Sequence, residues 1–456
     1  MSLNLESRFD AYCNELVKAL SHADRSQPAR WYLKGLMLPG SRKSVEPMAA
    51  RVHPKDVRSA HQSMHHLVAD AEWSDEALLA TVAGLVLPAL TRGGDTCNWI
   101  IDDTGFPKKG IHSVGVARQY CGQVGKTDNC RVAVSLSLGT QAGSLPLGYR
   151  LYLPREWTDD PERCLAAGVP SMIKFATKNE IARAQIEAAL KAGIPRGTVL
   201  GDAAYGDDTA LRDWLSEQNL IYALGVRTGT TVWWGEHQPV AAPIAGKRGK
   251  TKTHLTRDEN HQPISVLELA RALAPQCFRS VTWRQGVSEP LRSRFARVRV
   301  RAAHRDRPRA EEWLVIEWPK GEAEPTRYWL STHPKSITFA QLVDAIKARW
   351  RIERDYQELK QEFGLGHYEG RNWRGFHHHA SLCIAAYGFL MRERLSGAKK
   401  NGDQFKEPAL PEDFRPRGAR SDATAYAGLD CHIALSSGAR HLPRLASVPM
   451  LRASTR

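Results

Sequence analysis

The segment 339–363 constrains the fold most, because it contains neither proline nor glycine and has the apolar spacing of a helix. Its apolar stripe is formed by Ala345, Ala348, Ile352, Leu359 and Phe363. At about 100° per residue, four other side chains fall within roughly 60° of one another: Arg349, Glu353, Tyr356 and Lys360. We therefore expect one helix that packs on one side and presents a carboxylate between two cations on the other.

Two acidic positions upstream follow short apolar runs that are typical of strands. Asp102 ends the run Trp99–Ile101, and Asp202 ends the run 197–200. Carboxylates on two strand ends and one helix can converge on divalent metal, since Mg²⁺ takes a few carboxylates and keeps positions for water and phosphate oxygens. Two such ions support phosphoryl transfer. An equally open alternative is that Asp102 and Asp202 only cap turns or helices.

The charge balance indicates a polyanionic partner. The chain has 456 residues and a formal net charge of +15, with 42% hydrophobic and 25% charged residues. This globular but basic composition favours nucleic acid first and an anionic membrane second, and a merely basic soluble protein is the alternative. No apolar run is long enough to span a membrane, and the first residues lack a signal peptide's pattern. We expect a cytoplasmic, nucleoid-associated protein.

The residue spacing and composition change four times along the chain, so we expect five segments. They are a helical region that we expect to bind DNA (1–95), the first part of an α/β core (96–226), a β-rich insertion (227–335), the second part of the core with the Glu353 helix (336–396), and a flexible basic tail (397–456). The 8 cysteines include no CxxC pair, which favours reduced thiols over a zinc site.

Several basic groups outside the core are candidate phosphate contacts. In the N-terminal region they are Arg30, Lys34, Arg42, Lys43 and Arg51, for which a solvated surface is an equal alternative. The period-two run 295–302 places Arg297, Arg299 and Arg301 on one strand face. That face either lies along DNA or pairs with acidic neighbours. For the run His377–His379, an ordinary surface position ranks above phosphate contact, and phosphate contact above metal binding.

In this order and context, the three acidic positions resemble a DDE transposase of the bacterial insertion-sequence superfamily known as family four, in the branch numbered seven hundred and one. That superfamily's helix pattern is Tyr, two residues, Arg, three residues, Glu, six residues, Lys. Arg349, Glu353 and Lys360 fit its last three places, whereas Ile346 stands at the Tyr place. The first-Asp motif resembles segment 101–110 and the second resembles segment 199–206. Asp103 remains a competitor of Asp102 for the first position.

The resemblance implies an RNase-H-like catalytic core with a β-rich insertion and an N-terminal helical domain. It implies that Asp102, Asp202 and Glu353 hold two Mg²⁺ ions, with Mn²⁺ as a substitute, and that Arg349 and Lys360 bind phosphates beside the scissile bond. We also expect Lys108 and Arg351 to contact DNA phosphates, with a plain surface lysine as the alternative for Lys108.

The expected activity is metal-dependent cleavage at transposon ends followed by strand transfer to target DNA, in a cut-and-paste reaction. The expected partner is double-stranded DNA, bound by a homodimer in the synaptic complex, and no membrane is involved. Three alternatives stay open. They are a structure-specific nuclease with the same core, a catalytically inactive DNA-binding protein derived from a transposase, and an RNA-processing enzyme.

Overall fold

The computed structural model describes residues 4–94, 96–235, 262–285, 289–304 and 307–401. These residues belong to one compact unit, which spans Met1–Arg415. Nearly all of the expected tail lies outside the described residues, as does part of the expected β-rich insertion.

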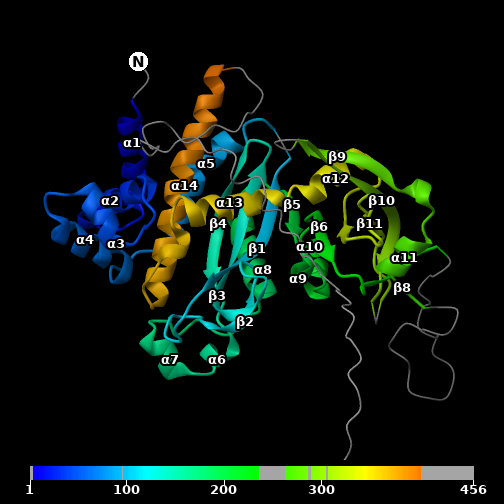
Figure 1. Ribbon diagram of the computed structural model, residues 1–456, viewed down its shortest axis with the longest axis horizontal. Helices are drawn as coiled ribbons and strands as arrows, with labels where there is room; N and C mark the ends of the chain where they lie inside the picture. Colours follow the sequence, from blue (N-terminus) through cyan, green and yellow to red (C-terminus); the bar gives the residue numbers. More distant parts are fainter. Residues whose placement is uncertain (1–3, 95, 236–261, 286–288, 305–306, 402–456) are drawn as a thin grey trace, which may run out of the picture. The chain divides into compact units, whose positions relative to one another are not determined.

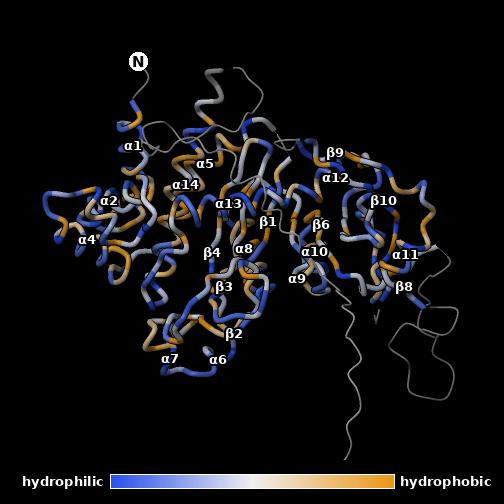
Figure 2. The backbone as a smooth tube through the Cα atoms, in the orientation of Figure 1, coloured by the Kyte–Doolittle hydropathy of each residue, from blue (hydrophilic) through white to orange (hydrophobic). Residues whose placement is uncertain are grey.

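The N-terminal region, for which we expected helices, contains five of them among the described residues. The helices are α1 (Leu5–Lys18), α2 (Ser26–Met37), α3 (Val45–Val52), α4 (Val57–Ala69) and α5 (Asp75–Leu90). Side-chain caps from Asn4, Asp56 and Ser74 begin α1, α4 and α5 by accepting backbone N–H groups. Helix α5 carries apolar residues on nearly every side (Figure 2), and one face of it, with Ala77, Ala80 and Gly84, remains exposed.

A large mixed sheet forms the centre of the fold (Figure 1). Its strands are β1 (Asn98–Pro107), β2 (Ala117–Cys121), β3 (Lys126–Thr140), β4 (Gly143–Leu151), β5 (Thr198–Gly201), β6 (Tyr222–Val226), β7 (Thr231–Trp233), β8 (Ile264–Ser265), β9 (Arg279–Gln285), β10 (Pro290–Ala302), β11 (Glu312–Glu317) and β12 (Arg327–Ser331). The order is β2-β3-β1-β5-β6-β12-β11-β10-β7-β8, with β4 paired to β3 and β9 to β10. Strand β5 runs parallel to both β1 and β6. The architecture is therefore mixed α/β, as expected.

The strands expected in the β-rich insertion extend this same sheet. Strand β12 pairs antiparallel with β6, and β11 and β10 follow it. On β10, Arg297 donates to the carbonyl of Ile337, and Arg299 and Arg301 both lie near the Glu311 carboxylate. We expected this face either to lie along DNA or to pair with acidic neighbours. Two of the three arginines, Arg299 and Arg301, do pair with an acidic neighbour.

The remaining helices lie between and beyond the strands. They are α6 (Arg155–Thr158), α7 (Pro161–Ala166), α8 (Lys178–Lys191), α9 (Ala203–Gly206), α10 (Thr209–Glu217), α11 (Val266–Ala272), α12 (Phe339–Lys347), α13 (Trp350–Gln361) and α14 (Trp373–Asn401), with 3-10 turns at Ala23–Arg25, Pro275–Cys277 and Leu365–His367. Of the described helices, none is long and apolar enough to cross a membrane.

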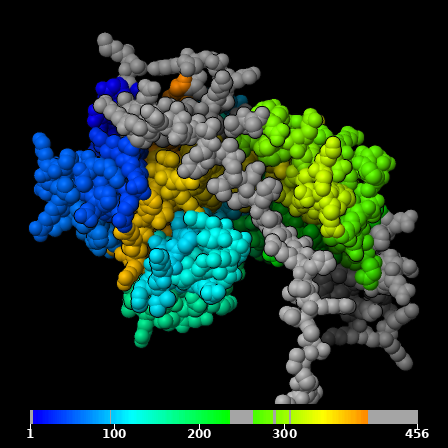
Figure 3. Space-filling model, viewed as in Figure 1, coloured from blue at the N-terminus to red at the C-terminus, as the bar shows by residue number. Residues whose placement is uncertain are grey.

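Helix α14 joins the N-terminal helices to the sheet. In Figure 3 the blue N-terminal helices lie directly against the gold segment that contains it. The Tyr12 hydroxyl donates to the carbonyl of Ala385 at 2.9 Å, and the rings of Phe9 and Phe389 meet edge to face at 5.3 Å. One hydrophobic core runs from these helices through β1 into β12. The N-terminal region therefore shares its core with the sheet.

Two expectations about this region are wrong. His377, His378 and His379 belong to α14 and are buried instead of lying on the surface. Their ring nitrogens form hydrogen bonds with backbone groups of neighbouring segments. Lys43 is also buried, and its ammonium group donates to the carbonyls of Leu36 and Leu38. Neither group is placed to meet DNA phosphates.

Segment 339–363 forms two helices where one was expected. Helix α12 ends at Lys347 and α13 begins at Trp350. At the break the N–H groups of Arg351 and Ile352 bond to carbonyls only three residues back, those of Ala348 and Arg349. A tightened turn of this kind needs neither proline nor glycine, so the sequence carries no signal for it.

Candidate active site

The register between β1 and β5 brings the two upstream aspartates to the same place. Parallel pairing aligns Asn98 with Thr198 and Ile100 with Leu200. Two residues further along, Asp102 and Asp202 follow in the same register. Since neighbouring strands lie about 4.8 Å apart, the two side chains start from adjacent backbone positions.

Asp102 does not end its strand, contrary to expectation. Strand β1 continues to Pro107 because the long antiparallel strand β3 goes on pairing with it, with Asp102 opposite Ser135. Only the parallel pairing to β5 stops, after Ile100. Asp202 stands just beyond the end of β5 and caps the short helix α9, where its Oδ1 accepts the Ala204 N–H at 2.9 Å. Asp202 therefore caps a helix through one of its oxygens, as the alternative interpretation predicted.

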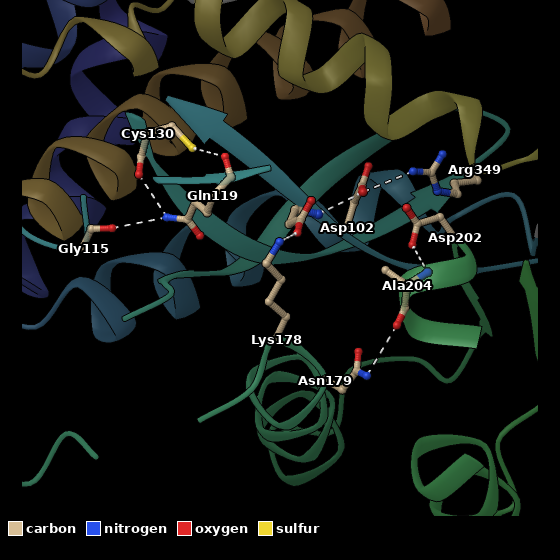
Figure 4. A network of polar contacts seen from close by, with 10 residues as sticks. Asp102, Gly115, Gln119, Cys130, Lys178, Asn179, Asp202, Ala204 and Arg349 are labelled. Atoms are coloured by element: carbon tan, nitrogen blue, oxygen red, sulfur yellow. Dashed lines mark hydrogen bonds and ion pairs between the residues drawn. The ribbon is translucent and has the colours of Figure 1, made fainter. Parts of the chain in front are cut away.

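Arg349 connects the aspartates to the helix. Its Nη2 donates to Asp102 Oδ1 at 3.1 Å, and its Nη1 lies 3.4 Å from Glu353 Oε1, one turn along α13. Asp202 is close enough for its negative charge to raise the pKa of the same guanidinium. Figure 4 shows Arg349 and Asp102 pointing toward each other, with Asp202 beside them. Arg349 therefore contacts carboxylates from β1 and α13, and the carboxylate at the end of β5 lies beside it.

Burial and charge make this cluster electrostatically unusual. Burial raises the pKa of Asp102 to about 6; Arg349 opposes the rise, while Asp202 and Asp103 add to it. For Arg349 burial alone would lower the pKa, but attraction to Asp102, Asp202 and Glu353 outweighs burial and the pKa is raised. Asp102 is only 6% exposed, whereas the Glu353 side chain is 68% exposed. The cluster is thus closed at Asp102 and open to solvent at Glu353.

Asp103, the competitor for the first acidic position, faces the opposite side of the sheet. Successive side chains of a strand point to opposite faces, and Asp103 forms an ion pair with Lys178 at the start of α8. Lys178 follows the Thr177 cap of a capping box, which fixes where the helix begins. The geometry therefore favours Asp102 over Asp103 as the member of the cluster. The sequence pattern did not identify Lys178 as the partner of Asp103, because the contact joins residues far apart along the chain.

Lys360 belongs to α13, like Glu353, and lies over a part of β1 beyond Asp102. Its ammonium group donates to the Gly105 carbonyl and to Gln123 Oε1, both at 3.1 Å. Burial lowers the pKa of Lys360 to about 8, although nearby Cys121 and Asp102 raise it. Both hydrogen-bond partners are neutral, so the Lys360 ammonium forms no ion pair in these two contacts.

The other two predicted phosphate contacts are directed elsewhere. The Lys108 ammonium donates to the Tyr368 carbonyl at 3.0 Å, and burial lowers its pKa to about 8. Lys108 lies six residues past Asp102, roughly 20 Å in an extended strand. The Arg351 guanidinium lies over the Trp350 ring at 5.0 Å. Arg349 and Arg351 point away from each other, since two residues turn a helix by about 200°.

Tyr356 forms part of the cluster's base, which the sequence indicated only by its helix face. Its hydroxyl is hydrogen-bonded to Ser135, the residue paired with Asp102 across the sheet. Burial and the charge of Asp102 raise the pKa of this hydroxyl. Ile346, at the place of the family tyrosine, is buried in α12 instead. Among the described residues of α12 and α13, Tyr356 therefore supplies the tyrosine hydroxyl near Asp102.

The donor set suits a divalent cation, although its present geometry does not hold one. Carboxylate oxygens are the ligands that Mg²⁺ prefers, and a buried carboxylate such as Asp102 needs a cationic partner. Within the described ranges no three His, Cys, Asp or Glu side chains are arranged to bind a metal ion together. Arg349 supplies the positive charge in this conformation.

Comparisons with known proteins give one family and one curated relative. Residues 15–290, more than half of the chain, match the family described as DDE superfamily endonuclease. The match includes Asp102 and Asp202 and ends before Glu353. A relative from Microchaete diplosiphon, described as a probable transposase for insertion sequence element IS701, is 34% identical over 221 residues. The alignment covers 48% of this chain and 53% of the relative, so the chain matches about half of that protein's length.

Proposed function

Because the chain belongs to the DDE superfamily endonuclease family, we propose that it is a DNA transposase. It would cleave DNA at transposon ends and join them to target DNA in a cut-and-paste reaction. The observation that carries the proposal is the meeting of three carboxylates, from Asp102, Asp202 and Glu353, around the Arg349 guanidinium. The match to a probable transposase supports it.

In this proposal the β1–β5–β6 part of the sheet is an RNase-H-like core. Asp102, Asp202 and Glu353 would hold two Mg²⁺ ions, or Mn²⁺ in their place. When bound, such ions activate an attacking oxygen and stabilise the leaving one. The buried Asp102 anchors the carboxylate set and the exposed Glu353 leaves room for DNA. Double-stranded DNA is the substrate, and we propose a homodimer in the synaptic complex.

The cationic side chains have separate tasks here. Lys360, with neutral partners only, binds a phosphate oxygen as a point charge. Arg349 can bind a phosphate flanking the scissile bond through two N–H groups. We propose that the N-terminal helices add DNA contacts through their surface, with Arg42 and Arg30 as exposed or partly exposed candidates.

Cleavage of DNA that carries the element's ends tests the proposal. We expect Asp202→Asn and Glu353→Gln to lower cleavage by at least about 10³-fold, since each removes a metal ligand. End binding and the melting temperature should stay close to wild type. Glu362→Gln, an exposed carboxylate at the end of α13, is the matched control and should cleave normally.

Two results would contradict the proposal. One is full cleavage in excess EDTA, and the other is normal cleavage by Glu353→Gln. Cleaved ends without any joined product would instead identify a structure-specific nuclease with the same core.

A further inference from the structure

The Arg349 guanidinium lies between Asp102 and Glu353, two of the carboxylates that we propose as metal ligands. One N–H group reaches Asp102 Oδ1 and another reaches Glu353 Oε1. Asp202 adds a third negative charge that stabilises the same guanidinium. Three carboxylates thus share one positive charge, which is less than one divalent cation would supply.

A guanidinium and a divalent cation cannot use these oxygens together in this arrangement. Mg²⁺ binds its oxygen ligands at about 2.1 Å, and the Arg349 N–H groups point at the oxygens that would have to do so. Two cations this close also repel strongly where burial has removed much of the water. Binding of a metal ion through Asp102 Oδ1 and Glu353 Oε1 therefore requires Arg349 to turn away.

Arg349 is built so that it can exchange partners. It precedes the first turn of α13 and belongs to the tightened break after α12. It makes one hydrogen bond to Asp102 and one to Glu353. Neither is the bidentate pair in which an arginine binds a carboxylate most strongly. Its Nε is buried and has no partner among the described residues. A phosphate could satisfy that Nε and one Nη together.

We infer that Arg349 and a divalent cation compete for Asp102 and Glu353, and that a DNA phosphate relieves the competition by taking Arg349 away. This inference rests on the proposed function. Metal and DNA then bind cooperatively, because each removes an obstacle to the other. Without DNA the carboxylates stay neutralised by Arg349, and the metal site forms fully only on the substrate.

Lys360 provides a matched comparison on the same helix. It is also cationic and also close to Asp102, but its hydrogen bonds go to the Gly105 carbonyl and to Gln123. Removing Lys360 should therefore weaken DNA binding without freeing any metal ligand. The competition belongs to Arg349 alone of these two cations.

A Mn²⁺ titration of the DNA-free protein tests the inference, with free Mn²⁺ measured by electron paramagnetic resonance. We expect Arg349→Met to bind Mn²⁺ at least about tenfold more tightly than wild type, since the competing cation is gone. Lys360→Met should stay within about twofold of wild type. Adding Asp202→Asn to Arg349→Met should remove the gain, which would show that the gain arises at these carboxylates.

A second measurement uses wild-type protein with and without end DNA. DNA should tighten Mn²⁺ binding in wild type, and this coupling should be small in Arg349→Met. Equal or weaker Mn²⁺ binding by Arg349→Met would overturn the inference. If that variant fails to fold, the absence of any DNA effect on Mn²⁺ binding in wild type would overturn it instead. If wild type binds no Mn²⁺ even with DNA, the proposed function itself fails.

Discussion

At the scale of single residues, two adjacent aspartates with the same chemistry have different partners. Asp102 faces α13 and contacts Arg349, while Asp103 faces α8 and contacts Lys178. The alternation of strand side chains separates them by the full thickness of the sheet. Of these two aspartates, only Asp102 therefore lies on the side of the sheet that faces Arg349 and Glu353.

This difference predicts unequal effects of matched substitutions. Asp103→Asn should keep DNA cleavage within about tenfold of wild type, whereas Asp102→Asn should lower it by about 10³-fold or more. Lys178→Gln, which removes the partner of Asp103, should resemble Asp103→Asn. Cleavage rates at saturating Mg²⁺ compare the three. A loss in Asp103→Asn as large as that in Asp102→Asn would reverse the assignment.

At the scale of elements, a buried ion pair joins α12 to the sheet just before α13 begins. The Lys347 ammonium donates to both oxygens of Glu317 on β11 at 2.9 Å, and both side chains are less than a tenth exposed. The rings of Trp283, Phe295 and Trp329 surround the ammonium, the nearest at 4.3 Å. Lys347 is the last residue of α12, so this pair fixes where the break begins.

Removing one partner of this pair should cost more than removing both. Lys347→Met leaves a buried Glu317 carboxylate without its cation, which we expect to destabilise the protein by about 3–5 kcal/mol. The double variant Lys347→Met/Glu317→Leu should recover a large part of that loss, because no charge remains buried. Denaturant unfolding of the three proteins measures the free energies of unfolding. A double variant less stable than Lys347→Met would contradict this account.

At the scale of the whole molecule, buried histidines make stability depend on pH. Burial lowers the pKa of His333, His377, His378 and His379 to about 4. His377 shows the geometric reason, since its Nδ1 donates to the Trp373 carbonyl and its Nε2 accepts the Leu151 N–H. A proton on Nε2 would displace the Leu151 N–H, and that bond joins α14 to β4.

The sign of the pH effect follows from these lowered values. The unfolded chain binds protons near pH 6.5 and the folded protein only near pH 4, so stability should fall as pH decreases through this interval. For His377 the full loss below pH 4 is on the order of 3 kcal/mol. The raised pKa values of Asp102 and Asp355, both about 6, act in the opposite direction and offset part of the loss.

Thermal unfolding between pH 7.5 and 4.5 checks this prediction. Wild type should melt at steadily lower temperature as pH falls. His377→Gln should start less stable at pH 7.5, because the bond to Leu151 is weakened, but should lose less stability over the same interval. Parallel curves for the two proteins would show that the pKa of His377 is the same in the folded and the unfolded protein, which would contradict the prediction.

The sequence by itself determined the mixed α/β class and predicted which acidic residues form the candidate site, because strand and helix periodicity and the spacing of Arg349, Glu353 and Lys360 are local properties of the chain. It did not locate the break between α12 and α13, the burial of the three histidines or the partner of Asp103. Those depend on contacts between segments far apart in the chain: the pairing of β1 with both β3 and β5, and the packing of α14 on the N-terminal helices. The same long-range pairing places Asp102 beside Asp202 and gives both of them Arg349 as a neighbour, which no local pattern could specify.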